Sequence, residues 1–600
     1  MLVVAGFNGL IPLQAQDNVN ANTDPDGQYE PGRAVARISV LNGDVSVRRG
    51  DSGDVGAAAI NGPLMADDRL LTSSNGRAEV QLDSSNMIRV GPNSEVRFTG
   101  MDVKSFQIQV ATGTVTFRTL RPSQAQVEVD TPSVAVRPLR PGAYRVTVHE
   151  DGTSEITVRA GEAEIDSQRG GEHLQAGHTM QARGPAADAE FQVVQPIPLD
   201  AFDRWNDDRD RLLLGSQSYQ HVSPDIGGAE DLDQNGQWVQ DPNYGSVWQP
   251  TNVGPDWAPY QNGRWVWEDY YGWTWVSADP WGWAPYHYGR WFMGVGGWAW
   301  YPGPIFADPY WAPAYVGFFG FGGRLGIGVG FGFGGVGWVP LAPFEVVHPW
   351  WGRGLYAGYR GGVFANHTTI INNASVMSAY RNARVTGGVM GVNAAGFGRG
   401  GQITSLNRSQ IQSAGLVHGV LPVSPDKSSL RMSDRAVSGR MPQASAQSFA
   451  SRMQTPQVQH ASFEQQQRGV QQMSRGNFSA PAARSGIGNG GSESTAHGWN
   501  RFGEPIHGTS GGTTGGTAGS AAGASSYSRS YSSPTGGFSR YDSARPSSGG
   551  SSSGSVRISP SIVAPRSSAA PRSSGGGSAR PSGGGGGHSG GGGHGGGGHR

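Results

Sequence analysis

Apolar and polar residues alternate with a period of two in short runs between residues 34 and 194, for example Phe106–Val110 and Tyr144–Val148. Such runs place every second side chain on the same face of a strand. Gly, Asn and Pro separate the runs, and Asn42-Gly43 is a dipeptide that favours a hairpin turn. The pattern predicts an all-β domain over residues 34–194, a β-sandwich with one buried and one solvated face per sheet.

A helical periodicity follows in the linking segment 195–216. Phe202, Trp205, Leu212 and Leu213 fall near one face of a helix. Acidic residues stand at its start and arginines near its end, the order that the helix dipole favours. Residues 200–215 are predicted to form one helix that packs as a spacer between modules.

Tryptophan dominates the next region, residues 217–351, which holds sixteen of the chain's 18 Trp. Three copies of a pattern recur, each with Gly-x-Trp and each closed by Trp-Ala-Pro; the first two turn at Tyr-Gly. Trp265 and Trp267 lie two apart, as do Trp273 and Trp275, and Trp281 and Trp283. On strands these pairs share a face, so each copy is predicted to be a hairpin with a row of indoles. The Ala-Pro step should end each ladder, because Pro donates no backbone hydrogen bond.

These indoles are expected to be mainly core. A buried Trp removes about 200 Å² from water, and few Leu, Ile or Val are present to form a core without them. A minority, near the Tyr-Gly turns and the Trp-Ala-Pro-Tyr exits, is predicted to remain exposed as an aromatic binding platform. The candidate binding residues are Trp267, Tyr271, Trp273, Trp275, Trp283, Tyr286, Arg264 and Arg290.

Glycine alternates with large apolar residues in segment 316–339. The favoured interpretation is a strand packed closely under the Trp layer; the alternative is a membrane-inserting or self-stacking segment. Residues 352–475 are polar, with little predicted order beyond short helices. The Gly/Ser/Arg/His-rich tail, residues 476–600, is predicted to be disordered.

Composition and charge bear on compartment and partners. The chain has no Cys, which excludes disulfides and thiolate metal sites. Residues 1–16 resemble a secretory signal without its basic n-region, and residues 17–33 a linker. The net charge is zero, so no specific nucleic-acid partner is expected, and the N-terminal apolar run is too short for a transmembrane helix. The Arg-rich tail could contact an anionic surface.

Residues 34–194 resemble the FecR-like domain, the periplasmic sensing part of iron-citrate-type regulators. The resemblance rests on Leu41-Asn42-Gly43-Asp44-Val45-Ser46-Val47, Gly76-Arg77-Ala78-Glu79-Val80-Gln81-Leu82, Ile88-Arg89-Val90-Gly91-Pro92-Asn93-Ser94-Glu95-Val96, Gly113-Thr114-Val115 and Gly142-Ala143-Tyr144-Arg145-Val146. Where the family usually has Gly-Asp, this chain has Asp67-Asp68. The family's regulators carry a cytoplasmic anti-sigma segment and a transmembrane helix first, so only the extracytoplasmic module is expected to carry over. Residues 217–351 are similar to a bacterial Trp-rich domain of unknown function often found beside FecR-like domains.

Signals for reaction chemistry are weak. Asp231, Asp233 and Asn235 match the first half of a Ca²⁺ loop, but Pro242 stands where a bidentate Glu is required. His588, His594 and His599 are candidate ligands for a transition metal in a flexible tail. No cofactor is expected.

The chain is thus predicted to be mostly β: a FecR-like all-β domain, Trp-rich β-hairpin repeats, one linking helix and a long disordered Gly/Ser-rich tail. The leading hypothesis is a non-enzymatic, exported binding or structural protein that recognises an envelope polysaccharide or protein. It would lie in the periplasm, at the outer membrane or outside the cell. The alternative is an extracytoplasmic sensor related to FecR-type signalling, and a glycan hydrolase is a remote third.

Overall fold

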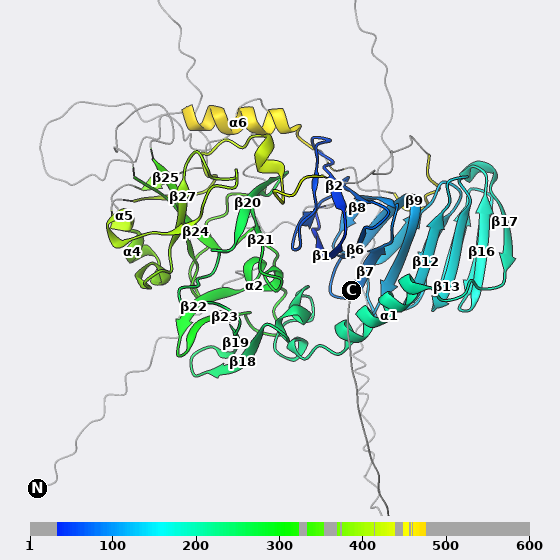
Figure 1. Cartoon of the computed structure of the whole chain (residues 1–600), viewed down its shortest axis with the longest axis horizontal. Coiled ribbons are helices and arrows are strands. Elements are labelled where there is room, and N and C mark those ends of the chain that lie inside the picture. Colours follow the sequence, from blue (N-terminus) through cyan, green and yellow to red (C-terminus); the bar gives the residue numbers. More distant parts are fainter. Residues whose placement is uncertain are drawn as a thin grey trace, which may run out of the picture. The chain divides into compact units, whose positions relative to one another are not determined.

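The computed structural model describes residues 33–322, 333–352, 369–371, 375–412, 414–437, 448–454, 458 and 460–475 (Figure 1). All of them belong to the first of two compact units, Met1–Gly488. The predicted signal peptide 1–16, nearly all of linker 17–33, and the tail with His588, His594 and His599 lie outside the described residues.

Residues 36–194 form two β-sheets that share one long strand, as the alternating pattern predicted. Sheet A has the order β4 (Pro63–Leu64), β1 (Ala36–Asn42), β6 (Arg77–Gln81), β7 (Asn86–Val90), β9 (Ser105–Thr119), β12 (Gly142–Val148), β13 (Ser154–Ala160), β16 (His178–Arg183), β17 (Glu190–Val194). Sheet B has the order β3 (Val55–Ala57), β2 (Val45–Arg48), β5 (Arg69–Thr72), β8 (Glu95–Asp102), β9, β10 (Gln126–Asp130), β11 (Ala135–Pro138), β14 (Glu162–Ser167), β15 (Gly170–Gln175). The β9–β10 pair is parallel and the others are antiparallel.

Strand β9 passes from one sheet to the other at Gly113. Its first half pairs with β8 in sheet B and its second half with β7 and β12 in sheet A. Gly113 has φ +87°, and a Cβ there would lie 2.2 Å from the Ser94 hydroxyl, so only glycine fits this bend. The Gly113-Thr114-Val115 piece of the family resemblance therefore marks the point where the two sheets join.

Helix α1 (Ala201–Leu214) forms where predicted, with a capping box between Asp200 and Asp203. The apolar residues predicted to share one face divide: Leu213 is buried, Phe202 and Trp205 are partly buried, and Leu212 is exposed. The buried residues are Asp203, Asn206, Asp210 and Leu213, whereas Leu212 is 51% exposed. The helix lies against sheet A (Figure 1), whose outer face carries arginines that pair with these carboxylates. Charge complementarity therefore decided which face is buried.

The three Trp copies fold as the three predicted hairpins: β18 (Gly236–Asp241) with β19 (Gly245–Pro250), β20 (Gly263–Glu268) with β21 (Gly272–Ser277), and β22 (Arg290–Gly294) with β23 (Gly297–Tyr301). Tryptophans face each other across each hairpin, as Trp238–Trp248, Trp265–Trp275, Trp267–Trp273 and Trp291–Trp300. The Trp265 and Trp275 rings meet edge to face at 5.3 Å. Of the sixteen indoles, thirteen are buried and three, Trp238, Trp257 and Trp311, are partly buried. The predicted Trp core is confirmed.

The glycine of each Gly-x-Trp motif lies beneath an indole of the opposite strand. A Cβ at Gly236 would lie 2.4 Å from the Trp248 ring, and one at Gly263 would lie 2.5 Å from the Trp275 ring. At Gly289 it would lie 2.6 Å from the Trp300 ring nitrogen. The motif thus couples a glycine to a buried indole, because any side chain there would displace the ring.

The strand predicted through Trp281 and Trp283 is wrong. Trp281 lies in a turn, and Trp283 begins the short helix α2 (Trp283–His287). Pro285 fits within the first turn of that helix, where its missing N–H is not needed. The Ala-Pro step therefore begins a helical turn in this copy.

The chain after the hairpins is more ordered than the polar composition predicted. A six-stranded sheet has the order β26 (Thr369–Ile371), β29 (Gly415–His418), β24 (Val316–Phe321), β25 (Gly335–Pro340), β27 (Met390–Asn393), β28 (Thr404–Ser405). The helices described in this part of the chain are α4 (Val376–Ala379), α5 (Arg408–Gln412) and α6 (Phe463–Arg475), with the 3-10 helices η5 (Arg381–Arg384) and η6 (Lys427–Leu430). The 3-10 helices η1 (Ala186–Asp188), η2 (Ser218–Gln220) and η3 (Ala229–Leu232) precede the hairpins.

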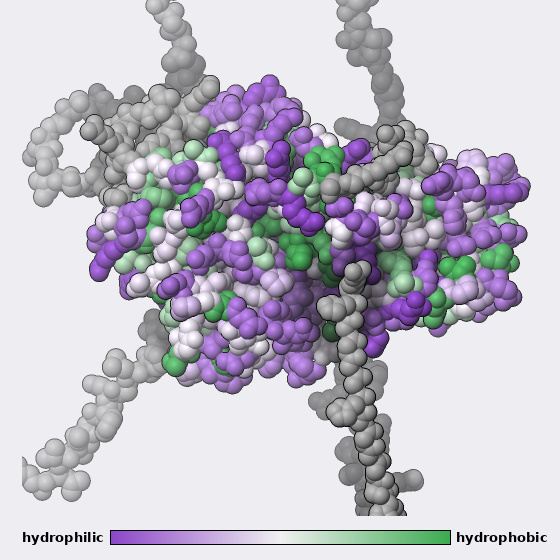
Figure 2. Space-filling view, viewed as in Figure 1, coloured by the Kyte–Doolittle hydropathy of each residue, from purple (hydrophilic) through white to green (hydrophobic). Residues whose placement is uncertain are grey.

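The two ends of the Gly/aromatic segment 316–339 form the adjacent strands β24 and β25, and residues 323–332 lie outside the described part. Phe318 of β24 packs 4.9 Å from Trp265, so these ends lie under the Trp layer as predicted. Among the described residues, no helix is both long and apolar enough to cross a membrane. On the face drawn in Figure 2, apolar residues form separate patches within a mostly hydrophilic surface.

Candidate functional site: the junction between the β modules

Charged side chains are buried where the first β domain meets the second Trp hairpin. Arg49, which follows β2, places Nη1 2.5 Å from Oε2 of Glu268 at the end of β20. The guanidinium also donates to the Trp267 carbonyl at 3.2 Å. Both charged side chains are nearly inaccessible to solvent. We call this region, with Asp67, Asp269 and His460, the junction.

Two buried carboxyls at the junction, Glu268 and Asp68, have raised pKa values. Burial raises the pKa of Glu268 to about 8, although the Arg49 charge opposes the increase. Burial likewise raises the pKa of Asp68 to about 6, against Arg49 and the backbone N–H groups of Gly50 and Met65. Because burial causes both increases, hydration of Glu268 or Asp68 would lower its pKa and favour its ionised form near neutral pH.

His460, 190 residues beyond the hairpin turn, closes the junction from the C-terminal side. Its Nδ1 lies 2.8 Å from Asp269 and its Nε2 lies 3.3 Å from Asp67, so one ring bridges the Trp hairpin and the first domain. Burial acts to lower the pKa of His460, but hydrogen bonds to Asp269 and Asp67 outweigh it and raise the pKa to about 9. The ring is therefore cationic at neutral pH.

Two junction residues have backbone conformations that are uncommon for side chains other than glycine. Asp67 has φ +69° and Tyr270, in the hairpin turn, has φ +70°. The Asp67 carboxylate contacts Arg97 at 2.7 Å as well as His460. Asp67 stands where the resembling family usually has Gly. Its backbone is therefore strained at this φ, but its carboxylate binds His460, which a glycine could not do.

Helix α6 is fastened to the same hairpin by an amide. The Gln466 side chain accepts from Trp267 Nε1 at 2.5 Å and donates to Asp269 at 3.1 Å. Gln466 and Asp269 are both buried. The first domain, the Trp hairpin and α6 therefore meet at one set of polar contacts.

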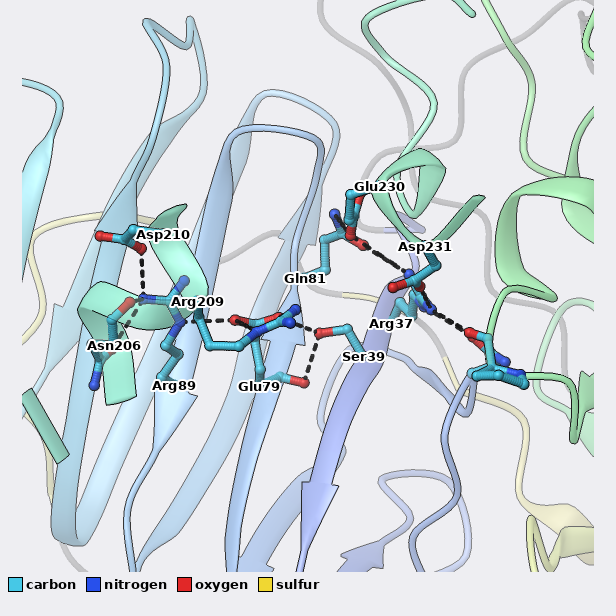
Figure 3. A network of polar contacts seen from close by, with 12 residues as sticks. Arg37, Ser39, Glu79, Gln81, Arg89, Asn206, Arg209, Asp210, Glu230 and Asp231 are labelled. Carbon is cyan, nitrogen blue, oxygen red and sulfur yellow. Dashed lines mark hydrogen bonds and ion pairs between the residues drawn. The ribbon is translucent and has the colours of Figure 1, made fainter. Parts of the chain in front are cut away.

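A second set of ion pairs joins the same modules through sheet A and α1 (Figure 3). Arg37 of β1 pairs with Asp231 and lies 3.8 Å from Glu230, both in η3 of the Trp-rich region. Glu79 of β6 lies 2.8 Å from Arg89 and 2.7 Å from Arg209 of α1. Burial acts to raise the pKa of Glu79, but these two arginines lower it to about 2. Glu79 is therefore ionised near neutral pH, whereas the raised pKa of Glu268 favours its protonated form.

The predicted binding residues have structural contacts instead of an exposed face. Trp267, Tyr271, Trp273, Trp275, Trp283, Tyr286 and Arg290 are buried. Trp273 donates to the Val423 carbonyl, and the Tyr286 hydroxyl donates to Asp279. Arg264 is partly buried and pairs with Asp434 at 2.9 Å. These side chains do not form an exposed aromatic platform, and a ligand-binding role for them stays a prediction.

The predicted calcium ligands do not converge. Asp231 pairs with Arg37, whereas Asp233 accepts from the backbone and hydroxyl of Ser218. Asn235 donates to the Asp231 carbonyl at 2.7 Å. No group of three or more His, Cys, Asp or Glu in the described part could hold a metal ion.

Sequence reasoning missed two features. One is the junction, where the contacts between the modules join residues at least 191 positions apart in the chain; its only local signal was Asp67 in place of Gly. The other is a surface aromatic cluster of Tyr244, Phe292, Tyr301 and Phe344. Phe344 is 60% exposed and has φ +69°. Tyr244 belongs to the first Tyr-Gly turn, so the predicted exposure at such turns holds there in part.

Comparison with known families finds separate matches for the first β domain and for the Trp-rich region. Residues 68–164 match the family described as FecR protein. The chain carries a FecR domain. Residues 229–345 match a family of unknown function, DUF6600, which covers the Trp hairpins and β24–β25 beside the FecR domain.

Other comparisons are more distant. No curated protein matches the chain. Two crystal structures of a candidate anti-sigma factor from Parabacteroides distasonis align with 17% and 16% identity and a TM-score of 0.19 each. Each alignment covers 21% of this chain and 59% of that protein.

Proposed function

We propose that this protein is an extracytoplasmic sensor in which the FecR domain and the Trp-rich module act as one regulatory unit on a protein partner. The observation that supports this most is the FecR match together with the junction. FecR-like domains are typically extracytoplasmic, and the signal-like residues 1–16 are consistent with export.

The energetics of the junction favour a regulatory role over a purely structural one. Burying a charged pair often gives no more stability than an apolar contact of similar volume, whereas removing one partner is costly. Arg49–Glu268 and the His460 bridge therefore make the contact between modules sensitive to any change in position or hydration. A ligand that moves the Trp hairpin would separate Arg49 from Glu268 and bring water to both groups, and the FecR domain would respond.

The test is deletion of the gene followed by complementation. The deletion is expected to change the expression of a defined set of envelope genes, and the wild-type gene is expected to restore it. The proposal fails if the transcriptome is unchanged across several envelope stresses. Fractionation of the tagged full chain checks export, since recovery in the cytoplasm would contradict an extracytoplasmic role.

The surface aromatic cluster favours a second candidate, non-enzymatic binding of an envelope polysaccharide. Phe344 lies in a turn whose Glu345 carboxylate accepts from the backbone N–H groups of Ala342 at 2.8 Å and Arg381 at 2.6 Å. The turn holds the ring outward in a strained conformation, and exposed aromatic faces can stack on sugars. Pull-down with purified envelope polysaccharide should lose most bound protein on Phe344→Ala, and none on the control Phe191→Ala. Equal retention of both variants excludes this site.

A further inference from the structure

A segment that follows the six-stranded sheet in the chain lies on the outer face of sheet B in the FecR domain. The segment, residues 448–454, is called the strap here. The Ala450 N–H donates to the Thr131 carbonyl at 2.9 Å, which aligns the strap with the end of β10. In sequence, more than 300 positions separate these two residues.

The strap binds a carboxylate through consecutive backbone groups. Glu128 of β10 accepts from the N–H of Arg452 at 2.9 Å, from the N–H of Met453 at 3.0 Å and from the Ser451 hydroxyl at 3.0 Å. Gln107 of β9 donates to the same hydroxyl at 2.5 Å. Within the domain, Gln107 also donates to Glu128 at 3.4 Å, and with the strap in place the carboxylate is 0% exposed.

The strap's arginine reaches a carboxylate near Glu128, Asp166 of β14, which also pairs with Arg137 of β11 at 2.8 Å. Arg452 donates to the Ser167 carbonyl at 2.6 Å and lies 3.7 Å from Asp166 of β14. Asp130 lies beside Glu128, and burial together with the Glu128 charge raises its pKa to about 9. We call Gln107, Glu128, Asp130 and Asp166 the sheet-B acid site.

The strap itself contributes little apolar burial. Ser451, Arg452 and Gln454 are exposed, and within the strap only Ala450 is buried. The strap is therefore held mainly by hydrogen bonds and by a partly exposed ion pair, each of which contributes little net free energy. The accepting carboxylates belong to paired strands of sheet B, whereas the strap side chains are mostly exposed, which is the arrangement of a site with an exchangeable ligand.

We propose that the sheet-B acid site is a peptide-binding site for an extended protein segment containing Ser-Arg, that the strap occupies it in cis, and that a partner protein's Ser-Arg segment displaces the strap. Two adjacent backbone N–H groups and a hydroxyl bind Glu128, and the arginine binds the Asp166 side. This inference deepens the proposed function, on which it rests for the expectation of a protein partner.

The experiment measures binding of a fluorescent peptide with the sequence of residues 447–455 to the full chain by polarisation. In the strap variant Ser451→Ala/Arg452→Ala the cis competitor is weakened, and the peptide should bind at least about tenfold more tightly than to wild type. The matched control Arg468→Ala, which alters an exposed arginine of α6, should bind as wild type does.

Two further arms locate the site. Adding Glu128→Gln to the strap variant should weaken binding by about tenfold or more, and so should replacing the peptide's arginine by alanine. The second arm needs no change in the protein, so it remains decisive if Glu128→Gln impairs folding. Equal affinity of wild type and the strap variant, or indifference to the peptide's arginine, overturns the proposal.

The result is separable from the transcriptional test. Peptide binding without any effect of gene deletion would support this site and reject the sensor function. A transcriptional effect without peptide binding would keep the sensor function and reject this site.

Discussion

Removing the His460 charge should loosen α6 at neutral pH and have little effect at high pH. In the folded chain the pKa of His460 is raised to about 9, from 6.5 for an ordinary histidine. A raised pKa contributes stability that is fully present below about 6.5 and is lost as the pH rises through about 9. The full shift would correspond to about 3.4 kcal/mol. Because the ring is partly accessible to solvent, screening reduces the expected effect to about 1–2 kcal/mol.

Hydrogen exchange of the α6 amides in the full chain measures this local free energy without requiring two-state unfolding. His460→Gln should speed their exchange by about 5- to 30-fold at pH 6–7, and the ratio to wild type should approach one above about pH 9. The control His149→Gln alters an exposed histidine and should leave α6 unchanged. Equal exchange at pH 6–7, or a ratio that grows with rising pH, would refute the reasoning.

Three further predictions concern other contacts. Gly263→Ala should lower the stability of the Trp-rich module by about 1–3 kcal/mol, because its Cβ would lie 2.5 Å from the Trp275 ring; thermal unfolding by Trp fluorescence checks this against Gly254→Ala, which meets no atom within 4 Å. Asp210→Asn should destabilise the packing of α1 by about 3–5 kcal/mol, because buried Arg89 loses a carboxylate at 2.7 Å; faster exchange of α1 than in the exposed control Asp208→Asn is the expected sign. Glu268→Gln should become more stable relative to wild type as the pH rises from about 4.5 to about 8. In this range the unfolded wild-type chain has lost the Glu268 proton and the folded chain has not, so the free energy of unfolding of wild type falls, whereas Gln does not titrate. Urea midpoints of the two proteins that diverge in the opposite direction would contradict this.

Local pattern was sufficient to predict the β domain, the Trp hairpins and the limits of α1, because strand alternation and helix caps act over a few residues. It was insufficient for the buried face of α1. One face of α1 carries Asp203, Asn206 and Asp210 at helical spacing, and a polar face is normally exposed to solvent. It is buried here because strands β9 and β13 of sheet A supply arginines that pair with its carboxylates, and these strands are distant in sequence. Trp281 and Trp283 show the related limit, since spacing of two indicates one face only if the backbone is extended.

The candidate site was less predictable than the fold. The rare aromatics attracted attention as binding residues, yet their size makes them the module's core, and Trp267 is 1% exposed. The charges that join the modules come from residues as ordinary as Arg49 and Glu268, and their significance depends on long-range packing. Asp67 was visible as a departure from a family pattern, but its partner His460 could not be identified from the sequence.

The most direct test of the account uses a chromosomal Arg49→Ala allele, compared with Arg211→Ala, which changes an exposed arginine paired with Asp208 on α1. If the FecR domain and the Trp-rich module signal as one unit through the junction, Arg49→Ala should reproduce the transcriptional effect of gene deletion while the exported protein remains at wild-type level. Arg211→Ala should behave as wild type. A normal transcriptome in the Arg49→Ala strain, with the protein present, would contradict the central claim.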